Sequence, residues 1–415
     1  MTGSPVWHPF TQHGLREPIP LVTRGEGAIL HTADGRRIVD AISSWWVTTH
    51  GHNHPRIVAA IREQAERLDQ VIFAGWTHEP AETLARGLTA IMPPALTRVF
   101  FSDSGSTSVE VALKMALGFW AARGEDRHRI LVMDGSYHGD TIGAMSVGAR
   151  GVFTRAYTPL LFDVGTVPFP APGREQDTLD ALERACAARP AAFIVEPLVL
   201  GAGGMLFYPS WVLAEMRAIC AGAGVLFIAD EVMTGWGRTG TLLACEQAGV
   251  VPDLLCLSKG LTGGSLPLAV TMATEPVFEA HYATDRARMF FHSSSYTANP
   301  IACAAANANL AIWRDEPVQV RIAALAGQQA THIERLRALP RVTGARVLGT
   351  IAAFELGEGE GYLSDLGPRL LAFFQERDVL LRPLGNTVYV MPPYSIEQAD
   401  LVHVYEAIVA AISTH

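Results

Sequence analysis

The feature that most constrains the fold is a regular alternation of strand-like and helix-like segments between about residue 95 and residue 275. Segments rich in aliphatic and β-branched residues predict strands, and helical patterns separate them. The expected strands are 98–101, 129–133, 192–195, 225–229, 253–257 and 268–273, and the expected helices include 106–123, 178–188, 209–221 and 300–314. This order predicts an α/β fold with a mostly parallel, doubly wound sheet.

The two ends of the chain follow other patterns. Residues 20–45 indicate a small meander of strands 21–24, 28–31 and 37–40, with Asp34-Gly35 as a hairpin turn. After residue 315, helices alternate with short strands at 346–348, 352–355 and 388–390. A chain of 415 residues is long enough for more than one core. We therefore predict a large domain of residues 51–310 and a small α+β domain made from residues 1–50 and 311–415.

Composition excludes several classes of function. A net charge of −9 without a basic run argues against a nucleic-acid or anionic-membrane surface. The uncharged stretch 197–214 is broken by glycine and proline, so it is not expected to span a membrane. Residues 1–10 contain no apolar signal segment, and the five cysteines form no C-x-x-C motif. These features predict a cytoplasmic protein with buried thiols and no metal.

Lysine is almost absent from the sequence. Of 32 basic residues only Lys114 and Lys259 are lysine. Because arginine would supply a positive charge equally well, each of these two positions raises the question of whether an amine is needed there. Lys259 follows an apolar strand in the turn Ser258-Lys259-Gly260, where an α/β sheet presents its chemistry. A buried lysine there can lose its proton and form an imine. Lys114 lies in the middle of a predicted helix, where we interpret it as a solvent-reaching side chain.

Three other polar groups follow predicted strands. Ser104-Gly105-Ser106-Thr107 opens a helix, which indicates either an anion site or ordinary N-capping. Asp230 follows four apolar residues, and a buried carboxylate needs a cationic partner: a protonated ring nitrogen or the nearby Arg238. In the segment 134–140, Tyr137 could stack on a flat ring, and His138 could be a base or a satisfied loop residue. With Lys259, this set meets the needs of pyridoxal phosphate.

These motifs resemble those of the class III aminotransferases of fold type I. Residues 230–240, followed by Ser258-Lys259-Gly260, are specific for that class, and the resemblance covers residues 7–394. Four further stretches are similar to the branch that makes 7,8-diaminononanoate for biotin: 7–11, 43–47 with 51–55, 196–204, and 381–385 with 391–394. The resemblance implies transfer of an amino group from S-adenosylmethionine to 8-amino-7-oxononanoate by a homodimer with its active sites at the subunit interface.

The resemblance also implies a role for each site residue. Lys259 would hold the cofactor covalently and move protons, Asp230 would pair with the ring nitrogen, and Tyr137 would cover the ring. The phosphate would be bound by Gly105 and Ser106, with Ser294 and Ser295 reaching across from the partner subunit. The substrate would contact Trp45, Trp46, Asp140, Ser293, Tyr394 and Phe10, and Arg382 would bind its carboxylate. Phe10 departs from the tyrosine common in the family, and residues 292–296 depart from its His-Gly-x-Thr type of loop.

Several alternatives stay open at this stage. His50-Gly-His-Asn-His54 could chelate a metal, although a polar loop before a helix start at Pro55 explains the pattern too. Trp45 and Trp46 could be core residues, and as neighbours at most one should enter a pocket. The activity could be that of an ω-amine:pyruvate aminotransferase, or the chain could bind the cofactor without turnover, as a regulator or carrier. Arg382 could instead form a structural salt bridge with Asp378.

Overall fold

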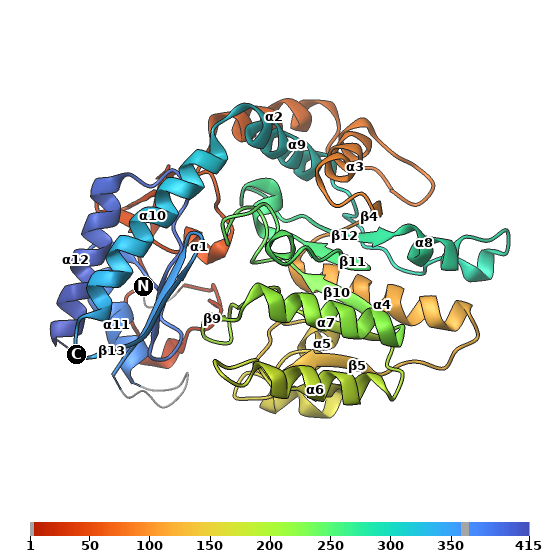
Figure 1. Cartoon of the computed structure of the whole chain (residues 1–415). Coiled ribbons are helices and arrows are strands. Elements are labelled where there is room, and N and C mark those ends of the chain that lie inside the picture. Colours follow the sequence, from red (N-terminus) through yellow and green to blue (C-terminus); the bar gives the residue numbers. More distant parts are fainter. Residues whose placement is uncertain (1–3, 358–364, 415) are drawn as a thin grey trace.

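A seven-stranded sheet forms the centre of the computed structural model, which describes residues 4–357 and 365–414 (Figure 1). Its order is β4-β12-β11-β10-β7-β5-β6. The strands are β4 (Leu96–Ser102), β5 (Ile130–Met133), β6 (Gly165–Val167), β7 (Ala192–Val195), β10 (Leu226–Asp230), β11 (Leu254–Leu257) and β12 (Ala269–Thr274). The α/β fold with a mostly parallel sheet, predicted from the alternation of segments, is confirmed.

One strand departs from the parallel order. β12 runs antiparallel to both of its neighbours, β11 and β4. The connection from β11 to β12 holds the short 3₁₀ turn η4 (Lys259–Thr262). A parallel return needs a crossover that is usually a full helix, and this turn is too short to provide one.

Helices cover both faces of the sheet because its strands are apolar on both sides. Alternate strand residues, such as Ile130, Val132, Ile194 and Ile228, pack on one face against α4 (Gly105–Ala122). The residues between them, such as Leu131, Phe193 and Phe227, pack with α6 (Glu175–Cys186) and α7 (Ser210–Ala223) on the other face. This arrangement is the doubly wound one.

Both ends of the chain meet in a second region, where the blue helices of Figure 1 gather. β15 (Val379–Leu380) extends the meander β1 (Val22–Glu26), β2 (Ile29–Thr32) and β3 (Arg37–Asp40), and pairs in parallel with β3. A separate sheet has the order β13-β14-β16, with β13 (Val342–Leu348), β14 (Ile351–Leu356) and β16 (Thr387–Val390). The helices there are α10 (Val318–Arg337), α11 (Leu366–Gln375) and α12 (Gln398–Thr414). The pairing of β15 with β3 joins segments from both ends of the chain in one sheet, while the boundaries at residues 50 and 310 stay a prediction.

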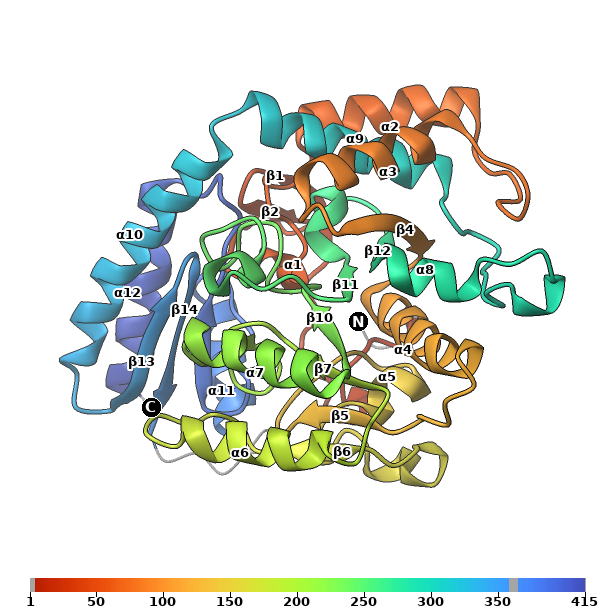
Figure 2. The same cartoon turned by 45° about the vertical axis from the view of Figure 1, so that its right-hand side comes forward.

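A third group of helices lies along one side of the molecule. α2 (Pro55–Arg67) and α3 (Glu79–Ile91) pack with α9 (Pro300–Asp315) in both views (Figure 2). The remaining elements are short: η1 (His13–Leu15), α1 (Ser43–Trp46), α5 (Ile142–Ser146), η2 (Arg155–Leu160), β8 (Val199–Leu200), β9 (Leu206–Phe207), η3 (Ala244–Ala248), α8 (Glu275–His281) and η5 (Arg286–Arg288). In the described part of the chain, no helix has the length and apolarity that a membrane span requires.

Candidate active site

The chemical groups predicted at strand ends meet at one edge of the sheet. Asp230 is the last residue of β10, and Lys259 follows β11 after a single residue. β10 and β11 are parallel neighbours in which Asp230 lies opposite Cys256. The carboxyl ends of parallel strands share an edge, which is where open α/β sheets bind ligands. The charge of Asp230 accordingly acts on the Lys259 amine.

The Lys259 side chain has the properties of a reactive amine. Burial lowers its pKa to about 8, and the positive charge of Arg238 acts in the same direction. The negative charges of Asp230 and Glu196 raise the pKa and only partly offset the effect of burial. Its Nζ lies 4.7 Å from the centre of the Trp46 ring and makes no hydrogen bond to another described residue. Its backbone has φ +46°, in the left-handed region that non-glycine residues rarely adopt. The amine is therefore free to act as a nucleophile slightly above neutral pH.

Asp230 has a partner that the sequence did not identify. His138 Nδ1 lies 2.7 Å from Asp230 Oδ2, and both side chains are buried. A carboxylate only accepts hydrogen bonds, so Nδ1 of His138 carries the proton. The Val232 N–H donates to the other oxygen, Oδ1, at 3.1 Å. The Asp230 carboxylate is thus fixed from two sides.

The alternative partner for Asp230, Arg238, is wrong. The Arg238 guanidinium is fully buried on the other side of the site and donates to the carbonyls of Pro392, Trp46 and Thr48, at 3.1–3.3 Å. Burial lowers its pKa, and its ring neighbour is Tyr394, 5.2 Å away.

Glu196 is a site residue that our candidate set did not include. It directly follows β7, as Asp230 ends β10, so the same signal of a polar residue after an apolar run marks it. Its buried carboxylate accepts the N–H groups of Tyr137 and Gly201, each at 2.9 Å. Burial, together with the charge of Asp230, raises its pKa to about 7, while His138 opposes the shift.

The start of α4 combines N-capping with free donors. Ser104 is the N-cap: its Oγ accepts the Thr107 N–H at 3.3 Å, and Thr107 Oγ1 accepts the Ser104 N–H at 2.9 Å. This box leaves the N–H groups of Gly105 and Ser106, at the positive end of the helix, for an anion. A side chain at Gly105 would lie 2.6 Å from Val232, so glycine is required there.

Tyr137 and Asp140 lie on the loop that follows β5. Tyr137 is 38% exposed, and burial together with the adjacent Asp140 carboxylate raises its pKa. Asp140 itself is exposed, and its N–H donates to Ser106 Oγ at 3.3 Å, which ties this loop to the start of α4. A Cβ at Gly139 would lie 2.0 Å from the same oxygen, so the close approach needs glycine.

The two adjacent tryptophans point in different directions, as expected for neighbours. Trp46 is 4% exposed, faces Lys259, and donates from Nε1 to the Tyr389 hydroxyl at 3.0 Å. Trp45 is 42% exposed and packs against Phe10, with ring centres 5.5 Å apart.

Arg382 lies beside Trp45. Its guanidinium is 5.4 Å from the Trp45 ring and donates to the Phe10 carbonyl at 3.3 Å. No carboxylate of a described residue pairs with it. Asp378 pairs instead with Arg36, at 2.6 Å, so the structural salt bridge considered for Arg382 is wrong.

The hydrogen bonds of Tyr394 and of the serine loop are with residues other than Lys259. The buried Tyr394 hydroxyl donates to the Trp236 carbonyl at 2.5 Å, and burial raises its pKa to about 12. Ser294 Oγ donates to Asp103 at 2.6 Å, and the loop of Ser293, Ser294 and Ser295 is largely exposed. The roles of these residues toward substrate and phosphate stay predictions.

The second lysine, Lys114, contacts the segment that precedes the serine loop. Lys114 Nζ donates to the Phe291 carbonyl at 2.7 Å and lies 3.2 Å from His292 Nδ1. It therefore anchors the segment before the serines.

The three histidines of residues 50–54 have three different partners. His50 Nε2 lies 2.8 Å from Asn309 Oδ1, His52 pairs with Asp40 at 2.8 Å, and His54 lies 3.4 Å from Glu316. The rings of His50 and His54 also lie edge to face, with their centres 6.0 Å apart. All five cysteines are buried and free, as predicted.

The groups at this edge fit pyridoxal phosphate. Free N–H groups at a helix start suit a phosphate, and a fixed carboxylate suits a protonated ring nitrogen. A half-exposed tyrosine suits a ring face, and an amine with no other partner suits an aldehyde. Lys259, Asp230, Gly105 and Tyr137 supply these four groups.

Comparisons with known proteins agree with this chemistry. The family model "Aminotransferase class-III" matches residues 11–412. A curated relative from Synechococcus elongatus, named adenosylmethionine-8-amino-7-oxononanoate aminotransferase, is 48% identical over 417 residues and 97% of each chain. A solved enzyme of that name from Methanocaldococcus jannaschii has a TM-score of 0.94 at 32% identity, over 99% of this chain and 97% of that one. A PLP-bound amine transaminase from an uncultivated Pseudomonas species has a TM-score of 0.93 at 31% identity, over 99% of each chain.

The chain belongs to the class III aminotransferases. It is accordingly an enzyme that depends on pyridoxal phosphate and acts on small molecules.

Proposed function

We propose that the protein transfers an amino group from S-adenosylmethionine to 8-amino-7-oxononanoate, a step of biotin biosynthesis. The observation that carries this proposal is the surroundings of Trp45, which is next in sequence to the Trp46 that faces Lys259. Arg382 stands there without an acidic partner among the described residues, beside the apolar faces of Trp45 and Phe10. A guanidinium next to apolar surface suits a carboxylate at the end of an alkyl chain, which is the far end of this ketone substrate. The name of these two relatives, adenosylmethionine-8-amino-7-oxononanoate aminotransferase, supports the same reaction.

The residues divide the work between binding and proton transfer. Pyridoxal phosphate, when bound, supplies the aldehyde that carries the amino group and a ring that accepts electrons. Gly105 and Ser106 bind its phosphate, and Tyr137 covers its ring. Asp230, held by His138, keeps a proton on the ring nitrogen, and Lys259 Nζ moves the proton at the reacting carbon.

The proposal includes a cytoplasmic homodimer. Phe291 and Tyr296, 66% and 65% exposed, flank the serine loop, and exposed apolar patches favour a partner surface. A cavity of about 730 Å³ lined by Phe278, Tyr282 and Phe290 opens beside the same loop. If a second copy bound this surface, Ser294 and Ser295 of each subunit would reach the cofactor phosphate of the other. The five free thiols support a reducing compartment.

A second candidate is an ω-amine:pyruvate aminotransferase. The solved amine transaminase with a TM-score of 0.93 favours it, as does Phe10, which lacks the hydroxyl common in the biotin branch.

A donor panel tests the proposal. The cofactor-bound protein is mixed with S-adenosylmethionine, alanine, lysine or simple amines, and conversion of the cofactor is followed by absorbance. We expect conversion with S-adenosylmethionine, followed by return of the spectrum on addition of 8-amino-7-oxononanoate. Conversion by alanine or simple amines alone would favour the second candidate, and no conversion by any amine would refute both.

A further inference from the structure

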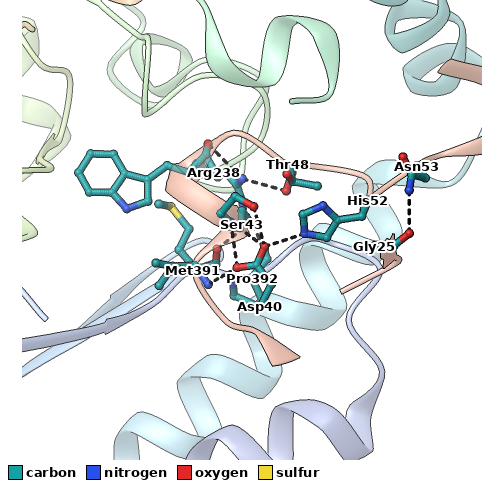
Figure 3. Close-up of polar contacts among 12 residues, drawn as sticks. Gly25, Asp40, Ser43, Thr48, His52, Asn53, Arg238, Met391 and Pro392 are labelled. Carbon is teal, nitrogen blue, oxygen red and sulfur yellow. Dashed lines mark hydrogen bonds and ion pairs between the residues drawn. The ribbon is translucent and has the colours of Figure 1, made fainter. Parts of the chain in front are cut away.

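Asp40 is a fully buried carboxylate outside the set of site residues described above. It ends β3, and its oxygens accept the Ser44 N–H at 2.6 and 2.9 Å, the Ile42 N–H at 3.2 Å and the Ser44 hydroxyl at 3.2 Å. His52 Nε2 lies 2.8 Å from Oδ2 and carries the proton between them. Figure 3 shows Asp40 and His52 meeting beside Ser43. Both oxygens of Asp40 therefore accept hydrogen bonds from the turn that follows β3 and from His52.

The turn that Asp40 holds has an unusual backbone. Three of its four residues have positive φ: Ser43 at 53°, Ser44 at 60° and Trp46 at 66°. Ser44 combines this φ with a ψ of −83°, close to a rare and strained γ-turn. Residues without the freedom of glycine hold such conformations only when their surroundings impose them. The bonds from Ser44 to Asp40 act on the most strained residue.

Other contacts fix the turn from its opposite side. The Ser43 hydroxyl donates to the Met391 carbonyl at 2.9 Å. Arg238 donates to the carbonyls of Trp46 and Thr48, each at 3.3 Å (Figure 3). The turn is thus held between Asp40 and Arg238, and its shape places the Trp46 ring 4.7 Å from the Lys259 amine.

We propose that Asp40 is a positioning residue for the active site: by holding the positive-φ conformation of the Ser43–Trp46 turn, it places Trp46 against Lys259 and Trp45 beside Phe10 and Arg382. The expected effect on turnover rests on the proposed function, whereas the contacts of Asp40 with the turn do not. Asp40 lies beneath the turn, so it acts through the two indoles.

Asn at position 40 is the sharpest substitution. Asp40→Asn keeps the size of the side chain but turns one acceptor into a donor group, which cannot accept from Ser44 or His52. We expect the turn to relax and Trp46 to move from Lys259. The catalytic efficiency with the acceptor should fall about tenfold to a hundredfold, which is what a displacement of about 1 Å costs.

The two lysines offer a readout that does not depend on turnover. In the full-length chain, labelled with ¹³C-lysine and freed of cofactor, NMR should resolve two side chains, Lys259 and the internal reference Lys114. The low pKa of Lys259 is due mainly to burial. With the indole displaced, water reaches the amine, so the Lys259 titration midpoint should rise by about one pH unit in Asp40→Asn.

Ser44 provides a rescue and an independent test. Glycine adopts positive φ without strain, so Ser44→Gly in the Asp40→Asn background should restore most of the efficiency and of the Lys259 midpoint. Ser44→Val leaves Asp40 intact but puts a β-branched residue at positive φ, so it should reproduce the defect even if the Asp40 variant does not fold.

Asp253 provides the matched control. It accepts the Phe227 N–H at 2.8 Å and pairs with Arg217 before β11, at the edge of the sheet opposite Lys259. Asp253→Asn should lower stability without moving the Lys259 midpoint.

Three results would overturn the proposal: an unchanged Lys259 midpoint in Asp40→Asn, a defect that Ser44→Gly does not restore, or an equal change in Asp253→Asn. The donor that gives turnover in the panel is used throughout, so a failure of S-adenosylmethionine as donor leaves this test intact.

Discussion

The strand-end edge and the Ser43–Trp46 turn face each other across Lys259, yet they are built in opposite ways. On the edge, Asp230 and Glu196 continue buried strands, and the parallel order of the sheet brings them together. The turn has three left-handed residues and is held by groups distant in the chain, such as Met391 and Arg238. The cofactor side therefore depends on topology, whereas the substrate side depends on a few buried polar contacts. A mutation on the first side should remove chemistry, and one on the second should change how substrate sits.

The largest effect is expected at Lys259 itself. Lys259→Arg keeps the charge, but a guanidinium does not exchange its proton or bond to the aldehyde, so transamination should fall about 10⁴-fold to 10⁶-fold. Borohydride reduction of the cofactor-bound wild type, followed by peptide mass mapping, should find the pyridoxyl group on Lys259. The matched control is Lys114→Arg, which can still donate to the Phe291 carbonyl and should keep its activity. A pyridoxyl group on Lys114 would contradict the assignment.

This asymmetry also explains what the sequence could predict. Asp230 and Lys259 were predictable because each follows an apolar run whose strand type is clear, and Glu196 carries the same signal. The His138 contact with Asp230 was not predictable, because it depends on how the loop after β5 reaches the end of β10, a strand that is not its neighbour in the sheet. The antiparallel β12 could have been inferred from the short connection that contains Lys259.

The substrate side carried a weaker signal in the sequence. Ser43-Ser-Trp-Trp46 contains no glycine, so its sequence does not predict that three of its residues have positive φ. The turn bonds to Met391, 348 residues later, and a contact of that separation follows from packing rather than from local pattern. The sequence predicted that the two indoles diverge, but not which one faces Lys259.

Asp230→Asn should give the next largest effect. An amide does not hold a proton on the ring nitrogen, so turnover should fall about 10²-fold to 10³-fold while cofactor still binds. Cofactor affinity and turnover are measured separately, and loss of affinity alone would assign Asp230 a merely structural role. Glu231→Gln is the control: this buried neighbour accepts from Ala244 and Cys245, so it should affect stability rather than turnover.

Arg382→Ala should affect one half reaction more than the other. Loss of a charged partner for the acceptor carboxylate should cost about 2–4 kcal/mol in transition-state terms, while the donor half reaction should lose less. Single-turnover kinetics of each half reaction measure the difference. Arg36→Ala, which breaks the ion pair with Asp378, should lower stability and should not affect one half reaction more than the other. Equal losses for Arg382→Ala would refute its role as the anchor.

The smallest effect tests the link between the two sides. His50 donates from Nε2 to Asn309, whose amide donates to the carbonyls of Gly260 and Leu261 beside Lys259, each at 3.0 Å. Burial lowers the pKa of His50 from 6.5 to about 4. The unfolded chain therefore takes up the proton first, so the stability from His50 is complete above about pH 6.5 and is lost as the pH falls toward 4.

Urea unfolding at two pH values measures this loss. Between pH 7 and pH 5 the wild type should lose about 2 kcal/mol through His50, because the folded state holds the ring neutral while the unfolded chain is protonated. His50→Gln keeps a donor for Asn309 without a titrating ring, so it should lose correspondingly less over the same range. His128→Gln, at an exposed histidine beside Asp126, should behave like the wild type. If His50→Gln keeps the full acid sensitivity, the loss arises elsewhere, and the neutral ring of His50 does not account for it.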